Sequence, residues 1–147
     1  MDIGAYLSGY ADGEGCFCVS INKSKRHRFN WEIRPSFSIS QNRDRANILR
    51  VFKRHLGCGS IRPDRSDKTL KFEVRSVNDL VSKVVPHFER YPLLSNKMLD
   101  FKLFADICRR MRDKKHLTRK GLQKILRIVD EINRSGKKKF FRRGIKL

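Results

Sequence analysis

Two stretches of this 147-residue sequence alternate apolar and polar side chains, and this alternation constrains the fold more than any other feature. The apolar members are Phe17, Val19 and Ile21 in residues 16–22, and Ile33, Phe37 and Ile39 in residues 30–41. A period of two is typical of β-strands that bury one face and leave the other in water. Pro35 falls on the apolar side and lacks a backbone N–H, so it predicts a bulge or an unpaired position.

Helical and extended patterns follow one another along the rest of the chain. The expected order is a helix over 3–12 that Gly13 and Gly15 end, strands over 16–22 and 30–41, a helix over 44–56, strands over 60–62 and 69–75, and helices that begin at Ser76, Ser95 and Thr118. Ser76 and Asp79 form a capping-box pattern, Pro86 and Pro92 bracket the end of the short helix that follows, and Gly136 closes the last helix. This order predicts one α+β domain over residues 1–136, with a four-stranded antiparallel sheet, followed by a basic tail over residues 137–147.

The charge of the chain is extreme, because 35 Lys and Arg residues face 15 Asp and Glu residues, which gives a net charge of +20. A compact domain with this charge repels itself, and a polyanion relieves the repulsion. Nucleic acid is the polyanion that we expect. A ribosomal protein or an anionic membrane surface would fit the charge alone, but no apolar run approaches the length of a membrane span. The N-terminus carries acidic residues and no Arg, so it does not read as a signal or transit peptide.

The four cysteines, Cys16, Cys18, Cys58 and Cys108, form no C-x-x-C pair, and the four histidines are scattered. A zinc site is therefore not expected. Apolar neighbours around the cysteines favour reduced, buried thiols in a cell interior.

The first helix combines a stripe of small residues with two acids at its end. Ala5, Gly9 and Gly13 are spaced at four, which lets two helix backbones approach closely. Asp12 and Glu14 oppose the helix dipole, and metal ions would compensate for this cost. If two copies cross at the stripe, the acids meet at the symmetry axis and form a carboxylate cluster suited to metals and phosphate. An ordinary helix end with a polar turn would explain the same spacing.

Residues 7–15, LSGYADGEG, closely resemble the defining motif of the LAGLIDADG homing endonucleases. Residues 39–41, 56–61 and 92–97 also resemble that family, so the likeness covers about residues 3–135. It implies the αββαββα fold with a curved, saddle-shaped sheet. Because the sequence holds one motif, the resemblance implies a homodimer on a near-palindromic double-stranded DNA site. Ala5, Ser8, Gly9, Asp12 and Gly13 are the expected dimer interface.

The resemblance also assigns metal ligands. Glu14 matches the acidic metal ligand of the motif, and the Gly13 carbonyl is a second candidate. Asp12 matches the other acidic position, whose usual role is structural or water-mediated. The expected metal is Mg²⁺, with Mn²⁺ or Ca²⁺ as substitutes in binding.

Three further residues take catalytic roles by the same resemblance. Gln41 fits the residue at the strand end that positions the attacking water, and Arg45 fits a basic residue that supports the scissile phosphate. Lys97 is the candidate for the active-site lysine, although Ser95 or Asn96 aligns there after a small shift. The family cuts both strands across the minor groove and leaves short 3′ extensions.

The outward faces of the strands form one polar set that suits the major groove of DNA. Its members are Ser20, Asn22, Glu32, Arg34, Ser36, Ser38, Ser40, Arg62, Thr69, Lys71, Glu73 and Arg75. Lys23, Lys25, Arg26, Arg28 and the tail are expected to grip phosphate. Any antiparallel sheet has one polar face, but that does not explain the excess of Arg and Lys here.

These features predict a site-specific double-strand DNA endonuclease of the intron-homing kind. The alternatives are an RNA maturase that assists splicing of a group I intron, a DNA-binding protein without catalysis, and an RNA-binding protein suggested by charge alone. The expected location is a bacterial cytoplasm or the interior of a chloroplast or mitochondrion.

Overall fold

The computed structural model of the chain describes residues 1–66 and 68–132. Its main elements are α1 (Ile3–Glu14), β1 (Gly15–Lys23), β2 (Trp31–Asn42), α2 (Asn47–Leu56), β3 (Ser60–Pro63), β4 (Thr69–Val74), α3 (Val77–Asp79), α4 (Val85–Arg90), α5 (Lys97–Arg112) and α6 (Arg119–Ile132). This order confirms the predicted α+β architecture. The predicted closure at Gly136 and the basic tail over residues 137–147 lie outside the described residues.

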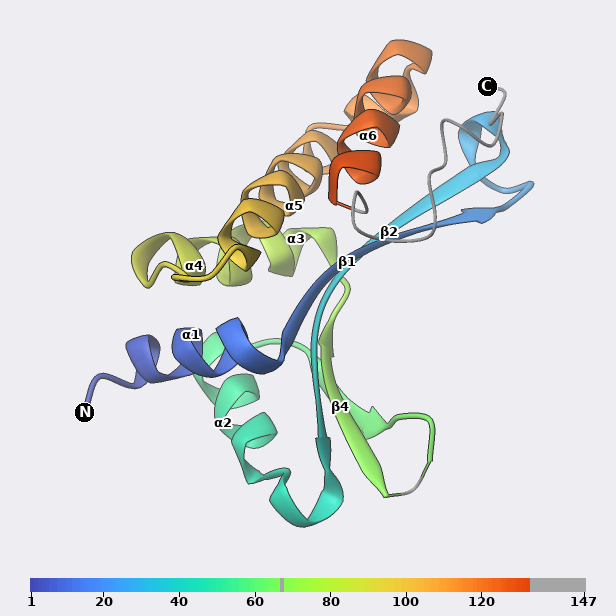
Figure 1. Ribbon diagram of the computed structural model, residues 1–147. Helices are drawn as coiled ribbons and strands as arrows, with labels where there is room; N and C mark the ends of the chain where they lie inside the picture. The colour runs from blue at the N-terminus through green and yellow to red at the C-terminus, as the bar shows by residue number, and fades with distance from the viewer. Residues whose placement is uncertain (67, 133–147) are drawn as a thin grey trace.

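The four strands form one antiparallel sheet in the order β1-β2-β4-β3. The sheet is strongly twisted, and the β1–β2 hairpin projects away from the end that carries β4 (Figure 1). The helices lie on one side of the sheet in the same view. The opposite face is therefore free of any helix that the structure describes.

Pro35 produces an unpaired position but no bulge. The register between β1 and β2 runs without interruption from Lys23↔Trp31 to Gly15↔Ile39, with Val19 opposite Pro35. On its other side, β2 pairs with β4 only from Phe37 onward. Because Pro35 has no partner on β4, its missing N–H breaks no hydrogen bond to that strand. Of the two predicted alternatives, the unpaired position occurs and the bulge does not.

The core lies between the sheet and the helices and is rich in phenylalanine. Phe37 and Phe72 of the sheet and Phe88, Phe101 and Phe104 of the helices are all fully buried. Phe17 of β1 contacts four of the other phenylalanine rings at centroid distances of 5.1–5.4 Å. Each such side chain contributes about 2–3 kcal/mol through burial, so the cluster fixes the helices over the sheet.

The end of α1 differs from the one predicted. Gly13 lies inside α1, which continues to Glu14, so only Gly15 ends it. Pro86 and Pro92 bracket the end of their helix, as predicted, because a π turn over Leu80–Val84 precedes Pro86 and the helical run continues to Arg90. The π turn replaces i→i−4 backbone hydrogen bonds by i→i−5 bonds, so that no backbone N–H is required at the position of Pro86. No helix in the described part of the chain is long and apolar enough to cross a membrane.

Candidate active site and nucleic-acid interface

Glu14 is the last residue of α1 and lies where the chain turns into the sheet. Gly15 follows it in extended backbone, and the Gly15 N–H donates to the carbonyl of Ala11. The Glu14 carboxylate is exposed to solvent, with the Tyr10 hydroxyl as an electrostatic neighbour. A carboxylate in this place faces the negative end of the helix dipole, which favours a nearby cation.

Lys97 supplies such a cation from the first turn of α5. Its ammonium group donates to the Gly15 carbonyl at 2.6 Å and to the Ala11 carbonyl at 3.1 Å. The Ala11 carbonyl also accepts the Gly15 N–H, so the ammonium adds a charged donor at the end of α1. The contact places a positive charge beside the acidic end of the motif although Lys97 lies more than eighty residues further along the chain.

Asp12 holds the loop that leads into α5. Its Oδ2 accepts the backbone N–H groups of Leu94 at 2.9 Å and Ser95 at 3.0 Å, and its Oδ1 accepts the Ser95 hydroxyl. The hydrogen bond from Ser95 is the main cause that lowers the pKa of Asp12. Both carboxylate oxygens are thus engaged within the chain, which favours the structural role expected of Asp12 over a contact with metal.

The side-chain contacts of Ser95, Asn96 and Lys97, the three candidates for the active-site lysine position, differ. The Ser95 hydroxyl donates to Asp12 and accepts the N–H of Lys97 at 3.1 Å, while the Asn96 side chain makes no capping hydrogen bond. Of the three residues, Lys97 is the one whose side chain reaches the end of α1.

Gln41 lies close to the acidic end of α1 because of strand register. Gly15 pairs with Ile39, so Glu14 and Gln41 lie just beyond that pair at the same end of the hairpin. The Gln41 side chain hydrogen-bonds to Tyr10, whose pKa is raised mainly by burial and then by the charge of Glu14. Tyr10 therefore connects the two predicted site residues, and the sequence pattern gave no sign of this role.

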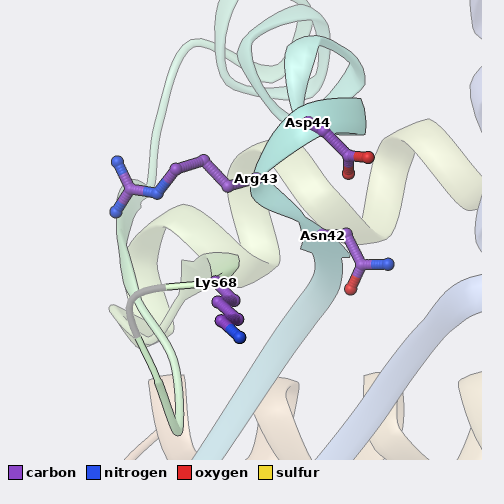
Figure 2. Close-up of a pocket in the computed structure, with 4 residues that line it drawn as sticks. All are labelled: Asn42, Arg43, Asp44 and Lys68. Carbon is purple, nitrogen blue, oxygen red and sulfur yellow. The ribbon is translucent and has the colours of Figure 1, made fainter.

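A wide depression lies where β2 leaves the sheet, between Gln41 and Arg45. Asn42, Arg43, Asp44 and Lys68 line it, and its volume is about 770 Å³. Figure 2 shows Arg43 extending to one side of the backbone while Asn42 and Asp44 extend to the other. The N–H of Arg43 donates to the Lys68 carbonyl at 2.8 Å, which fixes the turn after β3 against this end of β2. Arg45 is exposed at the end of the same short 3₁₀ turn.

The donors at the end of α1 suit a hard cation, but one chain supplies few of them. Glu14 offers carboxylate oxygens and Gly13 a backbone carbonyl, both of which Mg²⁺ and Ca²⁺ prefer. No group of three His, Cys, Asp or Glu side chains that could hold a metal occurs in residues 1–66 and 68–132. A site with few protein ligands fits Mg²⁺, which retains waters and takes further oxygens from phosphates.

The small-residue stripe of α1 is bare. A Cβ added at Gly9 or Gly13 would meet no atom within 4 Å, whereas one at Gly4 would lie 2.2 Å from the Tyr91 ring. Ala5 and Gly9 also line a groove of about 310 Å³ whose rim includes Leu94, which is 95% exposed. The stripe is therefore open to another backbone.

Ser8 also lines this groove, but its side chain is held within the chain. It is only 3% exposed, and its hydroxyl donates to the Tyr91 carbonyl at 2.6 Å. His87 Nε2 lies 3.1 Å from the Ser8 hydroxyl oxygen. Because the Ser8 proton is donated to Tyr91, the N–H of His87 is the donor in this second hydrogen bond. Ser8 joins α1 to α4 within the chain, so its hydroxyl is already engaged and offers little free surface to a second copy.

Strand register places the predicted polar residues on one face of the sheet, opposite the core. The cross-strand pairs on this face include Ser20↔Arg34, Asn22↔Glu32, Cys18↔Ser36, Ser38↔Glu73, Ser40↔Lys71, Asn42↔Thr69 and Arg62↔Lys71. Arg75 lies just beyond the end of β4. Ser38 differs from the other members of this set, because it is only 8% exposed. Its short side chain lies between Cys16 and Glu73 in the same cross-strand row.

Acidic residues on this face hold several of its cations. Arg34 pairs with Glu32 at 3.0 Å, and Arg62 and Arg75 approach Glu73 at 3.2 and 3.7 Å. Exposed ion pairs are worth about 1 kcal/mol or less, so a stronger anion can replace the acid.

The basic side chains of the turn between β1 and β2 differ in whether they contact other parts of the chain. Lys25 and Arg26 are exposed at its tip. Arg28 instead donates to the Leu117 carbonyl at 3.2 Å, and the ammonium of Lys23 lies over the Trp31 ring at 5.9 Å. Lys25 and Arg26 are therefore the better candidates for phosphate contacts.

Cys16 and Cys18 lie on the polar face of the sheet. Both are exposed, which contradicts the expectation of buried thiols, whereas Cys58 is half-buried and Cys108 is buried. The period of two already places them on the same side as Ser20. The hydrogen bond from Cys18, followed by the charges of Lys97 and Lys71, lowers the pKa of Cys16 to about 6.

Comparisons with known proteins agree with this geometry. A probable intron-encoded endonuclease of Neurospora crassa is 34% identical over 123 residues, which are 83% of this chain and 27% of that protein. The homing endonuclease I-ApeII of Aeropyrum pernix is 31% identical over 69% of this chain and 60% of its own length. The chain spans about a quarter of the length of the two Neurospora endonucleases that it matches.

Solved structures give the same result. The crystal structure of the homing endonuclease I-TnaI superposes with a TM-score of 0.83 at 35% identity and covers 90% of both chains. I-SmaMI, bound to an uncleaved DNA target in the presence of calcium ions, gives a TM-score of 0.85 at 29% identity over 89% of this chain and 45% of its own. The family described as LAGLIDADG endonuclease matches residues 7–108. The chain therefore belongs to the LAGLIDADG endonuclease family.

Proposed function

We propose that the chain is a metal-dependent, site-specific DNA endonuclease of the intron-homing kind that acts as a homodimer. The observation that carries the proposal is the position of Glu14. It is an exposed acid at the end of α1, and the Lys97 ammonium contacts the carbonyl of the next residue, Gly15. The open helix stripe precedes Glu14, and the first strand of the polar sheet face follows it. The names of the relatives, which include intron-encoded and homing endonucleases, support the same activity.

The proposed dimer forms when α1 of one copy crosses α1 of another at Ala5, Gly9 and Gly13. The absence of any atom within 4 Å of a Cβ at either glycine leaves room for a second helix backbone. Leu94 at the rim of the adjacent groove would lose its exposed apolar surface in such a contact. This crossing brings the two Glu14 carboxylates together at the symmetry axis.

Double-stranded DNA is the proposed substrate because of charge and shape. The chain carries +20, and the bare sheet face presents Arg, Lys, Asn and Ser side chains in rows. A curved sheet of this kind fits the major groove, where each base pair shows a distinct hydrogen-bonding pattern. A twofold axis through the protein implies a long, near-palindromic target. I-SmaMI, which shares the fold, was crystallised on its DNA target.

Cleavage requires an activated water and a stabilised leaving oxygen. Glu14 and the Gly13 carbonyl would hold Mg²⁺, with Mn²⁺ or Ca²⁺ as substitutes in binding, and the bound ion would supply Lewis-acid activation of water and phosphate. Gln41, already oriented by Tyr10, would position the attacking water. Lys97 and Arg45 would stabilise negative charge on the phosphate in the transition state.

The test is cleavage of a randomised DNA library in Mg²⁺ by the wild type, the Glu14→Gln variant and a control Glu131→Gln on the exposed surface of α6. We expect the wild type and the control to select one long site and cut both strands with short 3′ extensions. Glu14→Gln should bind that site but cut it about 1,000-fold more slowly or worse, as the loss of several kcal/mol predicts. Cutting by Glu14→Gln at the full rate would overturn the proposal, and binding without cutting by all three proteins would indicate a DNA-binding protein without catalysis.

A further inference from the structure

Cys16 and Cys18 form an exposed thiol pair on the bare face of the sheet. Both side chains leave β1 on the same side, Cys16 opposite Ser38 and Cys18 opposite Ser36. Because successive side chains of a strand alternate sides, Cys16 and Cys18 are adjacent on this face of β1. The other two cysteines are less accessible, because Cys58 is half-buried and Cys108 is buried.

This pair cannot close into an internal disulfide without moving the strand. Residues i and i+2 of a strand have their Cα atoms about 6.6 Å apart, and their Cβ atoms point in the same direction. A disulfide needs Cβ atoms about 3.5–4.5 Å apart. Oxidation of this face therefore favours a bond to an external sulfur over a bond between Cys16 and Cys18.

The surroundings of the pair favour an anionic reagent. The Lys97 ammonium lies against the Gly15 carbonyl, which belongs to the peptide bond that joins Gly15 to Cys16. Lys71 also acts on both thiols, while the acids near them are Asp100 and Glu73. The net charge of +20 further raises the local concentration of small anions.

We infer that Cys16 and Cys18 form a thiolation site for anionic low-molecular-weight disulfides of the glutathione class. A thiol of the pair gives its proton to solvent, and its sulfur attacks one sulfur of the reagent. One S–S bond breaks, a mixed disulfide forms on the protein, and the other half of the reagent leaves as a thiolate. Because the neighbouring thiol cannot form the internal disulfide, the mixed disulfide persists until an external thiol removes it.

A group attached here obstructs the sheet face. Cys16 lies in the row Cys16–Ser38–Glu73–Ser60, which crosses all four strands. A bulky anionic adduct in this row adds negative charge and fills the space that a duplex would occupy. This consequence rests on the proposed DNA-binding function, whereas the modification itself does not.

The test uses the reduced full chain with glutathione disulfide as the probe, followed by intact-mass measurement and peptide mapping. We expect the first adduct on the peptide that contains Cys16 and Cys18, with reversal by dithiothreitol. The double variant Cys16→Ser/Cys18→Ser should lose this adduct, and the matched control Cys58→Ser should keep it. A first adduct on Cys58 or Cys108, or no adduct in the wild type, would overturn the inference.

A second arm adds a mixed-sequence DNA duplex at low ionic strength before the probe. At about 100 times its Kd, the duplex should slow thiolation about 100-fold, and the isolated adduct should bind the duplex at least about tenfold more weakly. Unchanged thiolation despite measured DNA binding would overturn the placement of the pair at the DNA interface. If thiolation occurs but the reduced chain binds no DNA, the modification site is upheld and the proposed function fails.

Discussion

The Lys97 ammonium donates to the carbonyl oxygen of Gly15 at 2.6 Å, which connects the start of α5 to the end of α1. A second bond goes to the Ala11 carbonyl at 3.1 Å, at the same helix end. A cation there complements the helix dipole and offsets the unfavourable position of Glu14. One side chain thus serves the stability of α1 and places positive charge where the proposed chemistry needs it.

Lys97→Met should therefore affect both stability and cleavage. Methionine keeps most of the length of the side chain but loses the donors, so we expect the free energy of unfolding to fall by about 1 kcal/mol. The cleavage rate on a selected DNA target should fall about 100- to 1,000-fold. Lys102→Met, an exposed lysine on the same helix, is the control, and thermal unfolding and single-turnover cleavage are the measurements. Equal rates for the two variants would exclude a role of Lys97 in cleavage.

Asp12→Asn should disturb the loop before α5 rather than a metal site. The amide retains one acceptor oxygen, whereas the carboxylate accepts two backbone N–H groups and a hydroxyl. We expect the free energy of unfolding to fall by about 1 kcal/mol. This is at the low end for hydrogen bonds to a charged group, because the Asp12 carboxylate is accessible to solvent. Metal affinity, measured by titration in the presence of DNA, should change less than in Glu14→Gln. Asp113→Asn, at the exposed end of α5, is the control for loss of a carboxylate.

The strands could be predicted from sequence because their signal is local. The apolar residues at every second position define the buried face, and the alternation alone assigns Ser20 and Arg34 to the other face. The contacts of Asp12 could not be predicted, because its partners Leu94 and Ser95 lie more than eighty residues away. The same holds for Ser8, whose partner His87 comes from another helix.

Residue types near an element also fail to predict its exact conformation. Pro86 is normally a sign of a helix end, but the π turn before it removes the conflict. Ser38 has the residue type of an exposed position, but it is only 8% exposed where it lies between Cys16 and Glu73. Both outcomes depend on neighbours that no periodicity describes.

Gly9→Gln should abolish dimerisation without harming the fold of the single chain. A Cβ at Gly9 meets no atom within 4 Å outside its own helix backbone, and glutamine is a better helix former than glycine by up to about 1 kcal/mol. Thermal stability of the monomer should therefore stay equal or rise. Sedimentation velocity should show a dimer for the wild type and a monomer for the variant. Ser82→Gln, on another exposed helical turn, is the control, and an unchanged dimer in Gly9→Gln would exclude the stripe as the interface.

The double variant Lys25→Gln/Arg26→Gln should weaken the salt dependence of DNA binding. Each phosphate contact contributes about 0.9 to the slope of log affinity against log salt, so the slope should fall by about 1.8. Lys53→Gln/Arg54→Gln removes the same charge from α2, on the side of the sheet that carries the helices, and is the matched control. Fluorescence anisotropy over a range of salt concentrations measures both slopes. Equal slopes for the two double variants would mean that Lys25 and Arg26 do not contact phosphate.

His87 should make the fold sensitive to acid. Burial, followed by the nearby His55, lowers the pKa of His87 to about 4. The unfolded chain binds a proton at this residue near its ordinary pKa of 6.5, so the unfolded state gains protons first as pH falls. The contribution of neutral His87 to stability is complete above about pH 6.5, and about 2 to 3 kcal/mol is lost by about pH 4.

His87→Gln tests this dependence. The variant should be less stable than the wild type at pH 7, because it disturbs the buried contact with Ser8. The gap between the two proteins should narrow as pH falls from 6.5 to 4, since only the wild type loses stability through this side chain. His27→Gln, at the exposed turn after β1, controls for removal of a histidine from the surface. Urea unfolding at several pH values measures the gap, and a gap that stays constant across this window would show that His87 does not remain neutral in the fold.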